Sequence, residues 1–479
     1  MLSLMHRKTI FAFLGLFFSV SVFAQTGYEI KVTLKPFTKG YLFLAHYYGQ
    51  KQALVDSVPI NTNSEAVFSG KEKLPGGIYM IAFPNKDGYF ELVIDKEQRF
   101  SVSADSADLL RSVKFTGSKE NQLFKSYQDF TTVVGGEMNN LQKSYAKAPT
   151  KADSAKIMAQ LKDKNLQLKN YRQDFIKTNP DHLLSAVFKL LNDPVIPETY
   201  KDSALIYQYY KSHYWDGVNM SDTRLLRTPV FQPRFNRYFD EVLPQQADSL
   251  ILEADEMMFA ARGSKDMRQY ILATLTEKYV NPKYMGQDAV FVHLFQKYFI
   301  AGEADAWMTE KYKKFIFDRG YSLMANVVGE KGANLNMVDT TGKKTNLYDV
   351  KSTYTVVCFW DPTCSHCQVE VPKLDSFYHA KWKAMGVRIY GVMTDGGKDK
   401  WLTFIKEHNL KDWIHVYQTK EMKDAEIQAS QPGFRQLYDV YQTPMLYLLD
   451  ADKKILAKKL SYEQLNDFLD HKIKSSGTK

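Results

Sequence analysis

Hydrophobic and polar residues alternate along the first part of the chain, which predicts β-strands there. In the stretch YEIKVTL, every second residue from Tyr28 to Leu34 is apolar, as in a strand with one buried face. Four further apolar runs follow: YLFLAHYY, GIYMIAF, YFELVI and RFSVS. Segments rich in Gly, Pro and Asn separate these runs. Short strands with regular turns are typical of an antiparallel β-sandwich, which we place at residues 25–117.

Beyond about residue 118 the apolar residues recur with a helical period. One face of the first predicted helix carries an apolar row made of Leu123, Phe124, Tyr127 and Phe130. Thr150 and Asp153 fit a capping box that opens a second helix, which ends before Pro180. Further helical runs cover 181–192, 201–212, 231–243, 248–261, 265–279, 288–300 and 304–317. The pattern therefore predicts an all-α domain at 118–320.

Near residue 321 the pattern changes to strands that alternate with helices. A hairpin with a turn around Thr341-Gly342 is expected first. TYTVVCFW at 353–360 is a continuous apolar run, typical of a central strand buried on both faces. The segments that follow predict helices and strands in turn: CSHCQVEVPKLDSFYHAKW, GVRIYGVMT, DKWLTFIKEHNL, DWIHVYQ, FRQLYDV and a final pair of strands before EQLNDFLDHKIK. This order predicts a three-layer α/β domain at 321–479, and the whole chain is multidomain.

The first residues, 1–24, have the pattern of a secretory signal peptide. Arg7 and Lys8 precede the apolar run Ile10–Val22, and cleavage is expected after Ala24. The run is too short to span a membrane, and no later stretch reaches the ~18 apolar residues that a transmembrane helix needs. The residue directly after the cleavage point is Gln25 and not a cysteine, which argues against a lipid anchor. We therefore expect an exported protein of the periplasm or cell envelope, with no transmembrane segment in the mature chain.

The overall charge gives little information about partners. Removing Arg7 and Lys8 with the signal segment lowers the formal net charge from +9 to +7. The lysines are scattered along the chain, so a solvated basic surface explains them better than binding to nucleic acid. We expect no nucleic-acid partner.

The chain has three cysteines, and all of them lie within ten residues: Cys358, Cys364 and Cys367. A secreted protein that relied on disulfides would carry many more, so these cysteines serve one local site. Residues three apart at the start of a helix share a face, so the sulfurs of Cys364 and Cys367 can meet. The helix N-terminus favours a thiolate, the species that attacks disulfides. CxxC between a buried strand and a helix is a thioredoxin-like signal and suits a reversible dithiol–disulfide couple.

A zinc site is the metal alternative for this motif. Structural zinc needs four ligands, usually in two pairs, and the chain has no second CxxC. His379 and His408 lack the spacing of ligands. We therefore expect neither a metal nor another cofactor.

The segment FWDPTCSHCQVEVPKL resembles the active-site segment of the periplasmic TlpA/ResA-type thioredoxin-like thiol–disulfide oxidoreductases. The resemblance implies that Cys364 is the nucleophilic cysteine and Cys367 the resolving cysteine of a redox disulfide. It also implies that Glu370 is an acidic residue close to the thiols and acts in catalysis. The resemblance extends over Ala325–Lys474.

The segment QTPMLYLLD resembles the cis-proline loop of the same family. Pro444 is then the expected cis-proline, and the backbone of Thr443 is expected to pair with a bound substrate. Trp360 closes the Phe-Trp pair before the motif and joins these two as an expected substrate-binding residue. The rest of the chain resembles the multidomain envelope form of the family, in which a β domain and a helical domain of unknown function come first.

Three residues could tune the redox couple. His366 is either an exposed surface histidine or a group that stabilises the thiolate and makes the couple more oxidising, as in DsbA-like motifs. Glu370 is either a solvated helix residue or a carboxylate that raises the thiol pKa. Cys358 occupies the position of a buried Asp in thioredoxin, and is either a small core residue or a thiol that tunes Cys367. The direction of electron flow stays open.

The sequence therefore predicts an exported thiol–disulfide oxidoreductase. Its expected partners are protein thiols or disulfides in the envelope and an upstream electron donor or acceptor. The alternative is a non-enzymatic envelope binding protein in which Cys364 and Cys367 form an inert disulfide. The reduction potential separates these two hypotheses, because structural disulfides usually lie below about −300 mV.

Overall fold

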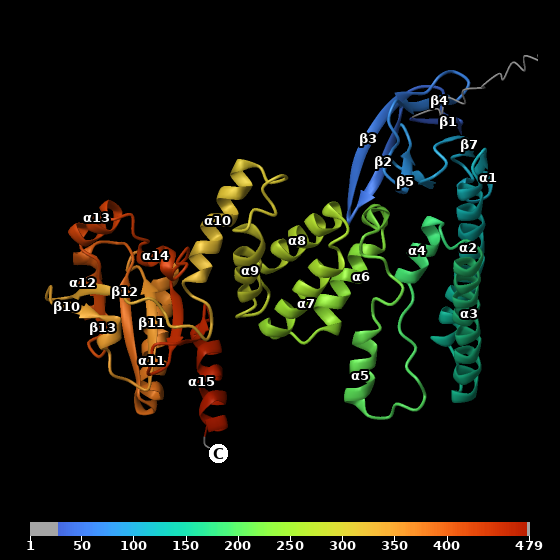
Figure 1. Ribbon diagram of the computed structural model, residues 1–479. Coiled ribbons are helices and arrows are strands. Elements are labelled where there is room, and N and C mark those ends of the chain that lie inside the picture. The colour runs from blue at the N-terminus through green and yellow to red at the C-terminus, as the bar shows by residue number, and fades with distance from the viewer. Residues whose placement is uncertain (1–26, 477–479) are drawn as a thin grey trace, which may run out of the picture. The chain divides into compact units, whose positions relative to one another are not determined.

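The computed structural model describes residues 27–476, so the predicted signal segment at 1–24 lies outside the described residues. The chain forms two compact units (Figure 1). Unit 1 comprises Met1–Asn192 with Arg224–Gln232, and unit 2 comprises Asp193–Thr223 with Pro233–Lys479. The helices of the predicted central domain are thus divided between the two units, and the domain boundaries drawn above remain a prediction. None of the described helices is both long and apolar enough to cross a membrane.

Unit 1 begins with two four-stranded sheets that enclose one hydrophobic core. The alternation in YEIKVTL is confirmed, because its apolar residues from Tyr28 to Leu34 are the buried ones. One described pair, β1 with β7, is parallel, and the other strand pairs are antiparallel. The strand order in the first sheet is β4 (Glu65–Gly70), β1 (Tyr28–Lys35), β7 (Arg99–Asp105) and β8 (Lys114–Thr116). The order in the second sheet is β3 (Lys51–Pro59), β2 (Tyr41–Tyr48), β5 (Gly77–Ala82) and β6 (Tyr89–Ile94).

The sequence pattern missed three of these strands, β3, β4 and β8. No residue of β3 is buried, so it lacks the apolar alternation that marks a half-buried strand. β8 is only three residues long, which leaves too few positions for a period to be recognised, whereas β4 alternates buried and exposed residues and was overlooked.

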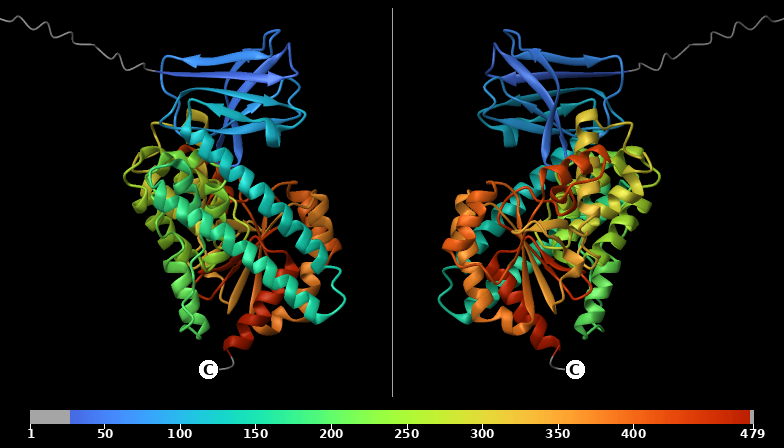
Figure 2. Two further views of the ribbon diagram at one scale, coloured as in Figure 1. Left: turned by 90° about the vertical axis from the view of Figure 1, so that its right-hand side faces the viewer. Right: turned by 90° about the vertical axis from the view of Figure 1, so that its left-hand side faces the viewer.

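The helices of unit 1 follow the strands, and α2 and α3 pack side by side as a long hairpin (Figure 2). The capping box of α3 is confirmed: Thr150 accepts a hydrogen bond from the Asp153 N–H at 3.1 Å. Asn121 of α2 is fully buried and bonds both backbone groups of Val93 on β6, each at 2.8 Å. The helices are α1 (Leu109–Ser112), α2 (Lys119–Tyr145), α3 (Lys151–Thr178), α4 (Leu183–Leu190) and the 3-10 turn η1 (Thr223–Arg227).

The helical part of unit 2 matches the predicted runs with local differences. The runs 231–243 and 288–300 each end in a π-helical turn. The run predicted at 304–317 begins later, because Thr309 caps a helix that starts at Glu310. The helices are α5 (Ser203–Ser212), α6 (Phe231–Arg237), η2 (Tyr238–Val242), α7 (Ala247–Ala260), α8 (Lys265–Tyr279), α9 (Asp288–Leu294), η3 (Phe295–Phe299) and α10 (Glu310–Met324).

The last part of unit 2 is a seven-stranded mixed sheet with helices on both faces, the thioredoxin-like α/β fold that the sequence predicted. Its central strand β11 is parallel to β12 and antiparallel to β14. Residues 355–360 of β11 are buried, with alternate side chains in the cores on the two faces. The order is β10 (Lys344–Asn346), β9 (Asn336–Asp339), β13 (Ile414–Tyr417), β12 (Val387–Met393), β11 (Tyr354–Trp360), β14 (Met445–Leu449) and β15 (Ile455–Lys458).

Helices α11, α12 and α15 supply one core of this sheet, and α14 contributes to the other. The sequence pattern missed α13, which has no buried residue and therefore no apolar period. The helices are η4 (Leu347–Asp349), α11 (Ser365–Ala380), η5 (Trp382–Met385), α12 (Lys398–Glu407), α13 (Lys420–Gln428), α14 (Phe434–Leu437) and α15 (Tyr462–Ser476).

Within unit 2 a buried ion pair joins the helical part to the sheet. The Nζ of Lys458, on β15, lies 2.5 Å from Oδ2 of Asp288 on α9, and the two side chains are 3% and 6% exposed. Lys458 also donates a hydrogen bond to the carbonyl oxygen of Asn326 at 2.6 Å. Buried charges persist only when they are paired in this way, so these contacts fix α9 against β15.

Candidate active site

A short loop between β11 and α11 positions the two close cysteines. Oδ1 of Asp361 accepts hydrogen bonds from the N–H and the hydroxyl of Thr363, each at 2.7 Å. These bonds close a turn directly before Cys364, which stands at the N-cap of α11. Cys367 follows within the first turn of the helix, on the same face.

Cys364 is the partly exposed thiol of the pair, and its pKa is lowered. Burial acts to raise this pKa, but hydrogen bonds from the Cys367 N–H, from the side chains of Thr443 and Cys367 and from the His366 N–H outweigh it. The position at a helix N-terminus favours the thiolate in the same direction. Cys364 is therefore the sulfur that is ready to act as a nucleophile.

Cys367 lies behind Cys364 and is fully buried. Burial raises its pKa to about 12, against a hydrogen bond from the backbone N–H of Asp361, whose nitrogen is 3.4 Å from the sulfur. A negative charge on Cys364 raises the pKa further. Cys367 therefore keeps its proton at neutral pH until Cys364 has been consumed by a bond to another sulfur. All three cysteines of the chain are free thiols.

Cys358 lies on β11 in the same hydrophobic cluster as Cys367. It is fully buried, and burial together with charge on Cys367 raises the pKa of Cys358 well above its ordinary value. Its thiol is consequently neutral whenever Cys367 ionises. This favours the packing interpretation of Cys358, and its tuning role remains a prediction.

The loop before β14 lies against the exposed thiol. The Thr443-Pro444 peptide bond is cis, as the family resemblance implied for Pro444. In its protonated form, the Cys364 thiol donates a hydrogen bond to the carbonyl oxygen of Thr443, with a sulfur–oxygen distance of 3.5 Å. A second polypeptide that pairs with the backbone of this loop would therefore lie beside Cys364.

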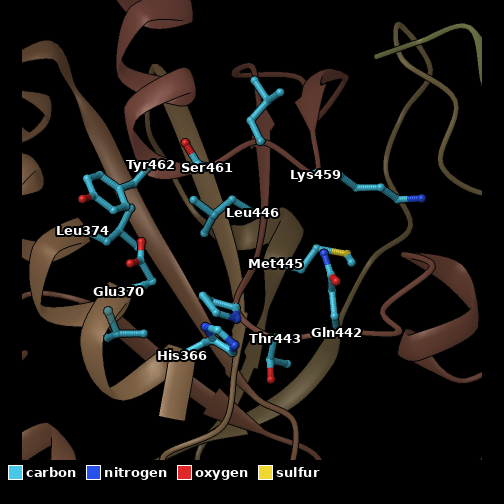
Figure 3. A pocket seen from close by; sticks show the side chains of 13 residues that line it. His366, Glu370, Leu374, Gln442, Thr443, Met445, Leu446, Lys459, Ser461 and Tyr462 are labelled. Carbon is cyan, nitrogen blue, oxygen red and sulfur yellow. The ribbon is translucent and has the colours of Figure 1, made fainter. Parts of the chain in front are cut away.

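A hollow of about 400 Å³ opens next to this loop (Figure 3). Four of the predicted site residues line it: His366, Glu370, Thr443 and Pro444. Figure 3 shows Glu370 beside Leu374 and Tyr462, whereas His366 lies nearer Thr443. The Nζ of Lys373 lies 3.5 Å from Oε1 of Glu370. The Glu370 side chain is 34% exposed, so its carboxylate faces a partly solvated space.

The sequence missed three further residues that line this hollow, Gln442, Lys459 and Tyr462. Lys459 and Tyr462 follow β15, and they reach the site only because this end of the chain folds back beside α11. No local pattern identifies them. Gln442 directly precedes the cis-proline dipeptide, and its proximity to Pro444 in the sequence is the one available signal.

Trp360 requires a correction. Its side chain is fully buried in the core between β11 and α12, where its ring packs against Phe404 at a centroid distance of 5.2 Å. Its ring also lies 6.2 Å from that of the buried His415. Trp360 therefore supports the site from within the core and does not offer the substrate contact that the resemblance implied.

A metal centre has no support among residues 27–476. No group of three or more His, Cys, Asp or Glu side chains in this range is arranged to hold an ion. The expectation that the site uses neither metal nor cofactor stays a prediction.

Comparison with known proteins places the chemistry in the last part of the chain. Residues 328–458 match the AhpC/TSA family. Residues 28–124 and 145–318 match two families described as domains of unknown function, DUF4369 and DUF5106. Thiol-disulfide oxidoreductase ResA of Bacillus cereus is 28% identical over 145 residues, which are 30% of this chain and 76% of that protein.

Two solved structures are also similar. A domain of a possible thiol-disulfide isomerase from Cytophaga hutchinsonii is 40% identical, with 32% of this chain and 97% of that chain covered and a TM-score of 0.28. A thioredoxin-like protein from Bacteroides caccae is 21% identical, with 58% of this chain and 97% of that chain covered and a TM-score of 0.44.

Proposed function

We propose that Cys364 and Cys367 exchange electrons with proteins of the cell envelope. The chain belongs to the thioredoxin-like thiol–disulfide oxidoreductases. The observation that carries this proposal is the asymmetry of the two thiols. Cys364 is partly exposed with a lowered pKa, and Cys367 is buried behind it with a pKa of about 12. Such a pair presents one sulfur to a partner and holds the other in reserve.

In the reductive direction, the thiolate of Cys364 attacks one sulfur of a substrate disulfide. A bond forms between Sγ of Cys364 and that sulfur, and the other substrate sulfur leaves as a thiolate. Cys367 then loses its proton and attacks Sγ of Cys364. This forms the Cys364–Cys367 disulfide and releases the second substrate thiolate, so two electrons have passed to the substrate. The same steps in reverse oxidise a substrate dithiol.

Glu370 is the proposed acceptor of the Cys367 proton. It lines the hollow next to the thiols and is partly solvated, so it can pass a proton to water. Thr443 and Pro444 are the proposed seat of the substrate backbone, since the Thr443 carbonyl already lies beside Cys364.

His366 and Glu370 act on the potential in opposite directions. A cation at His366 would stabilise the Cys364 thiolate and make the couple more oxidising, whereas a carboxylate at Glu370 disfavours that charge. Both side chains line the hollow. The proposed function therefore includes exchange in either direction, with an upstream donor or acceptor of electrons completing the cycle.

The cell-envelope location in this proposal rests on the signal-peptide pattern at residues 1–24. An oxidising compartment also suits a protein whose cysteines are confined to one exchange site. Expression of the full chain with its first 24 residues, followed by fractionation, would place the mature protein outside the cytoplasm.

Two substitutions test the proposed exchange in a turnover assay with insulin as the disulfide substrate. Cys364→Ser is expected to abolish turnover, because no other exposed sulfur can attack. Cys367→Ser is expected to accumulate a mixed disulfide between Cys364 and the partner. Ser376→Ala, an exposed position on the same helix, serves as the control. Turnover retained by Cys364→Ser would exclude the proposed exchange.

A further inference from the structure

The hollow beside the redox site is the first of three adjoining hollows in unit 2. A second, of about 320 Å³, shares Lys459 and Leu460 with it. A third, of about 1050 Å³, shares Met285 and Gly286 with the second. Because neighbouring hollows share lining residues, the three lie in a row, and this row is called the groove below. It runs from the Thr443 loop, across the segment before α9, to helices α7 and α9.

Paired charges hold the two walls of this groove together. Lys458 and Asp288, both lining the second hollow, form the buried ion pair between β15 and α9. Arg319 of α10 and Lys459 each lie 2.5 Å from a carboxylate oxygen of Asp439, which is 7% exposed. The groove is therefore formed before any ligand arrives, which lowers the entropic cost of binding.

The far end of the groove is rich in amide side chains. Gln245, Gln246, Gln287 and Gln296 all line the third hollow. Gln287 is held in place by hydrogen bonds to Gln245, whereas Gln246 and Gln296 are exposed in the groove. A side-chain amide both donates and accepts hydrogen bonds, as a peptide group does. These positions can therefore pair with a polypeptide backbone whatever its sequence.

The middle of the groove offers apolar contact. Tyr284, Met285 and Tyr441 line the second hollow, and they are 49%, 39% and 64% exposed. Large exposed apolar side chains in a cleft are typical of sites that bind other polypeptides. Basic and acidic groups occur together along the groove, for example Lys331 beside Glu330 and Lys458 beside Asp288. The lining thus lacks the uniform basic character that a nucleic acid requires.

We propose that this groove binds an extended segment of the substrate polypeptide that flanks the cysteine reacting with Cys364. The inference rests on the proposed exchange function and adds to it a role for the helical part of unit 2. The row begins at Thr443, which favours a polypeptide as the occupant, because a chain seated on Thr443 is long enough to extend over the adjoining hollows. The helical part then contributes affinity for unfolded segments, and the redox site contributes the chemistry.

Peptides of two lengths test this inference. Each carries a central cysteine in mixed disulfide with a coloured thiol; one is a tripeptide, and the other has about 15 residues, ~50 Å when extended at ~3.3 Å per residue. The wild-type protein is expected to react with the longer peptide at a kcat/KM roughly tenfold higher, which corresponds to ~1.4 kcal/mol. Gln296→Trp and Gln246→Trp, which replace an amide with a bulky ring in the lining of the third hollow, are expected to remove this advantage and to leave the tripeptide rate unchanged.

Gln208→Trp is the matched control, since Gln208 is exposed on α5 and lines none of the three hollows. Equal kcat/KM values for the two peptides in the wild type would contradict the proposed role of the groove. The proposal would also fail if Gln296→Trp and Gln246→Trp kept the higher kcat/KM for the longer peptide. A wild type inactive on both peptides would instead refute the exchange function. In that case the groove can still be tested by the binding of a fluorescent peptide of about 15 residues with Ser in place of the central cysteine. Its Kd should rise roughly tenfold in Gln296→Trp and not in Gln208→Trp.

Discussion

The thiols of Cys364 and Cys367 are three positions apart, but their pKa values shift in opposite directions. Hydrogen bonds at the start of α11 outweigh burial for Cys364, and burial dominates for Cys367. A nucleophile must be ionised and reachable, and a resolving thiol must stay protonated until it is needed. The difference between the two environments therefore assigns the order of attack.

Alkylation with iodoacetamide tests this order. Only the thiolate reacts, so the rate should rise with pH and reach half its plateau below about 8.5, the ordinary pKa of cysteine. The direction follows from the lowered pKa of Cys364, whereas Cys367, with a pKa of about 12, should stay unmodified. Mass spectrometry locates the label, and Cys364→Ser is the control. A midpoint above 8.5, or label on Cys367, contradicts the assignment.

Cys358→Ala separates packing from tuning. The side chain is fully buried and neutral, so its loss should cost about 1 kcal/mol of stability through lost packing. The reduction potential should move by less than about 30 mV, the equivalent of ~1.4 kcal/mol for a two-electron couple. Titration in glutathione buffers gives the potential, and urea denaturation gives the stability. A larger shift in potential would establish Cys358 as a tuning residue.

At this scale the sequence identifies residues whose role is written in a short motif. Cys364, Cys367 and Pro444 belong to that group. Trp360 is expected at the substrate from the family resemblance alone, although it ends the apolar run 353–360 that predicts a strand buried on both faces, and it lies in the core. Lys459 and Tyr462 lie at the site because the end of the chain folds back beside α11, and a local sequence pattern does not predict such a long-range contact.

At the scale of helices and strands, most elements with a buried face could be predicted, whereas some exposed elements could not. β1 and β11 show the two extremes, one alternating and one continuously apolar. β3 and α13 have no buried residue, and the sequence pattern missed both. Periodicity reports burial, so an element that buries nothing gives a weaker signal, although α5 was predicted without any buried residue.

Asn121 links helix α2 to strand β6, and its substitution tests how much this link stabilises the fold. Its buried amide satisfies the N–H and C=O of Val93, which face outward from the edge strand β6. Asn121→Ala leaves both groups unpaired and should cost about 2 kcal/mol or more. Asn140→Ala, exposed on the same helix, should change stability by less than about 0.5 kcal/mol. Similar urea midpoints for the two variants would show that this link contributes little.

At the scale of the whole molecule, the ion pair of Lys458 and Asp288 joins segments far apart in the sequence. Neither residue belongs to a recognisable motif, so the sequence did not predict how the helical part of unit 2 meets its sheet. The same contact places Asp288 of α9 in the wall of the second hollow. Long-range pairing of this kind depends on the completed fold.

Removing one partner of this pair should destabilise unit 2 strongly. Asp288→Ala leaves the ammonium of Lys458 buried without its carboxylate, which should cost roughly 3 kcal/mol. The double variant Asp288→Leu with Lys458→Met should recover most of the loss, because no unpaired charge remains. Asp318→Ala, which breaks the exposed pair with Lys314, should cost less than about 1 kcal/mol. A double variant as unstable as Asp288→Ala would contradict the charge-pairing explanation.

The reduction potential of the Cys364–Cys367 couple tests the central claim most directly. The full-length mature protein is equilibrated in glutathione or dithiothreitol buffers, and the fraction of oxidised pair is read by mass after alkylation. We expect one reversible two-electron transition at a potential more oxidising than about −300 mV, as in working thiol–disulfide couples. A potential well below −300 mV, or a bond that does not re-form on oxidation, would mark an inert structural disulfide and contradict the exchange function.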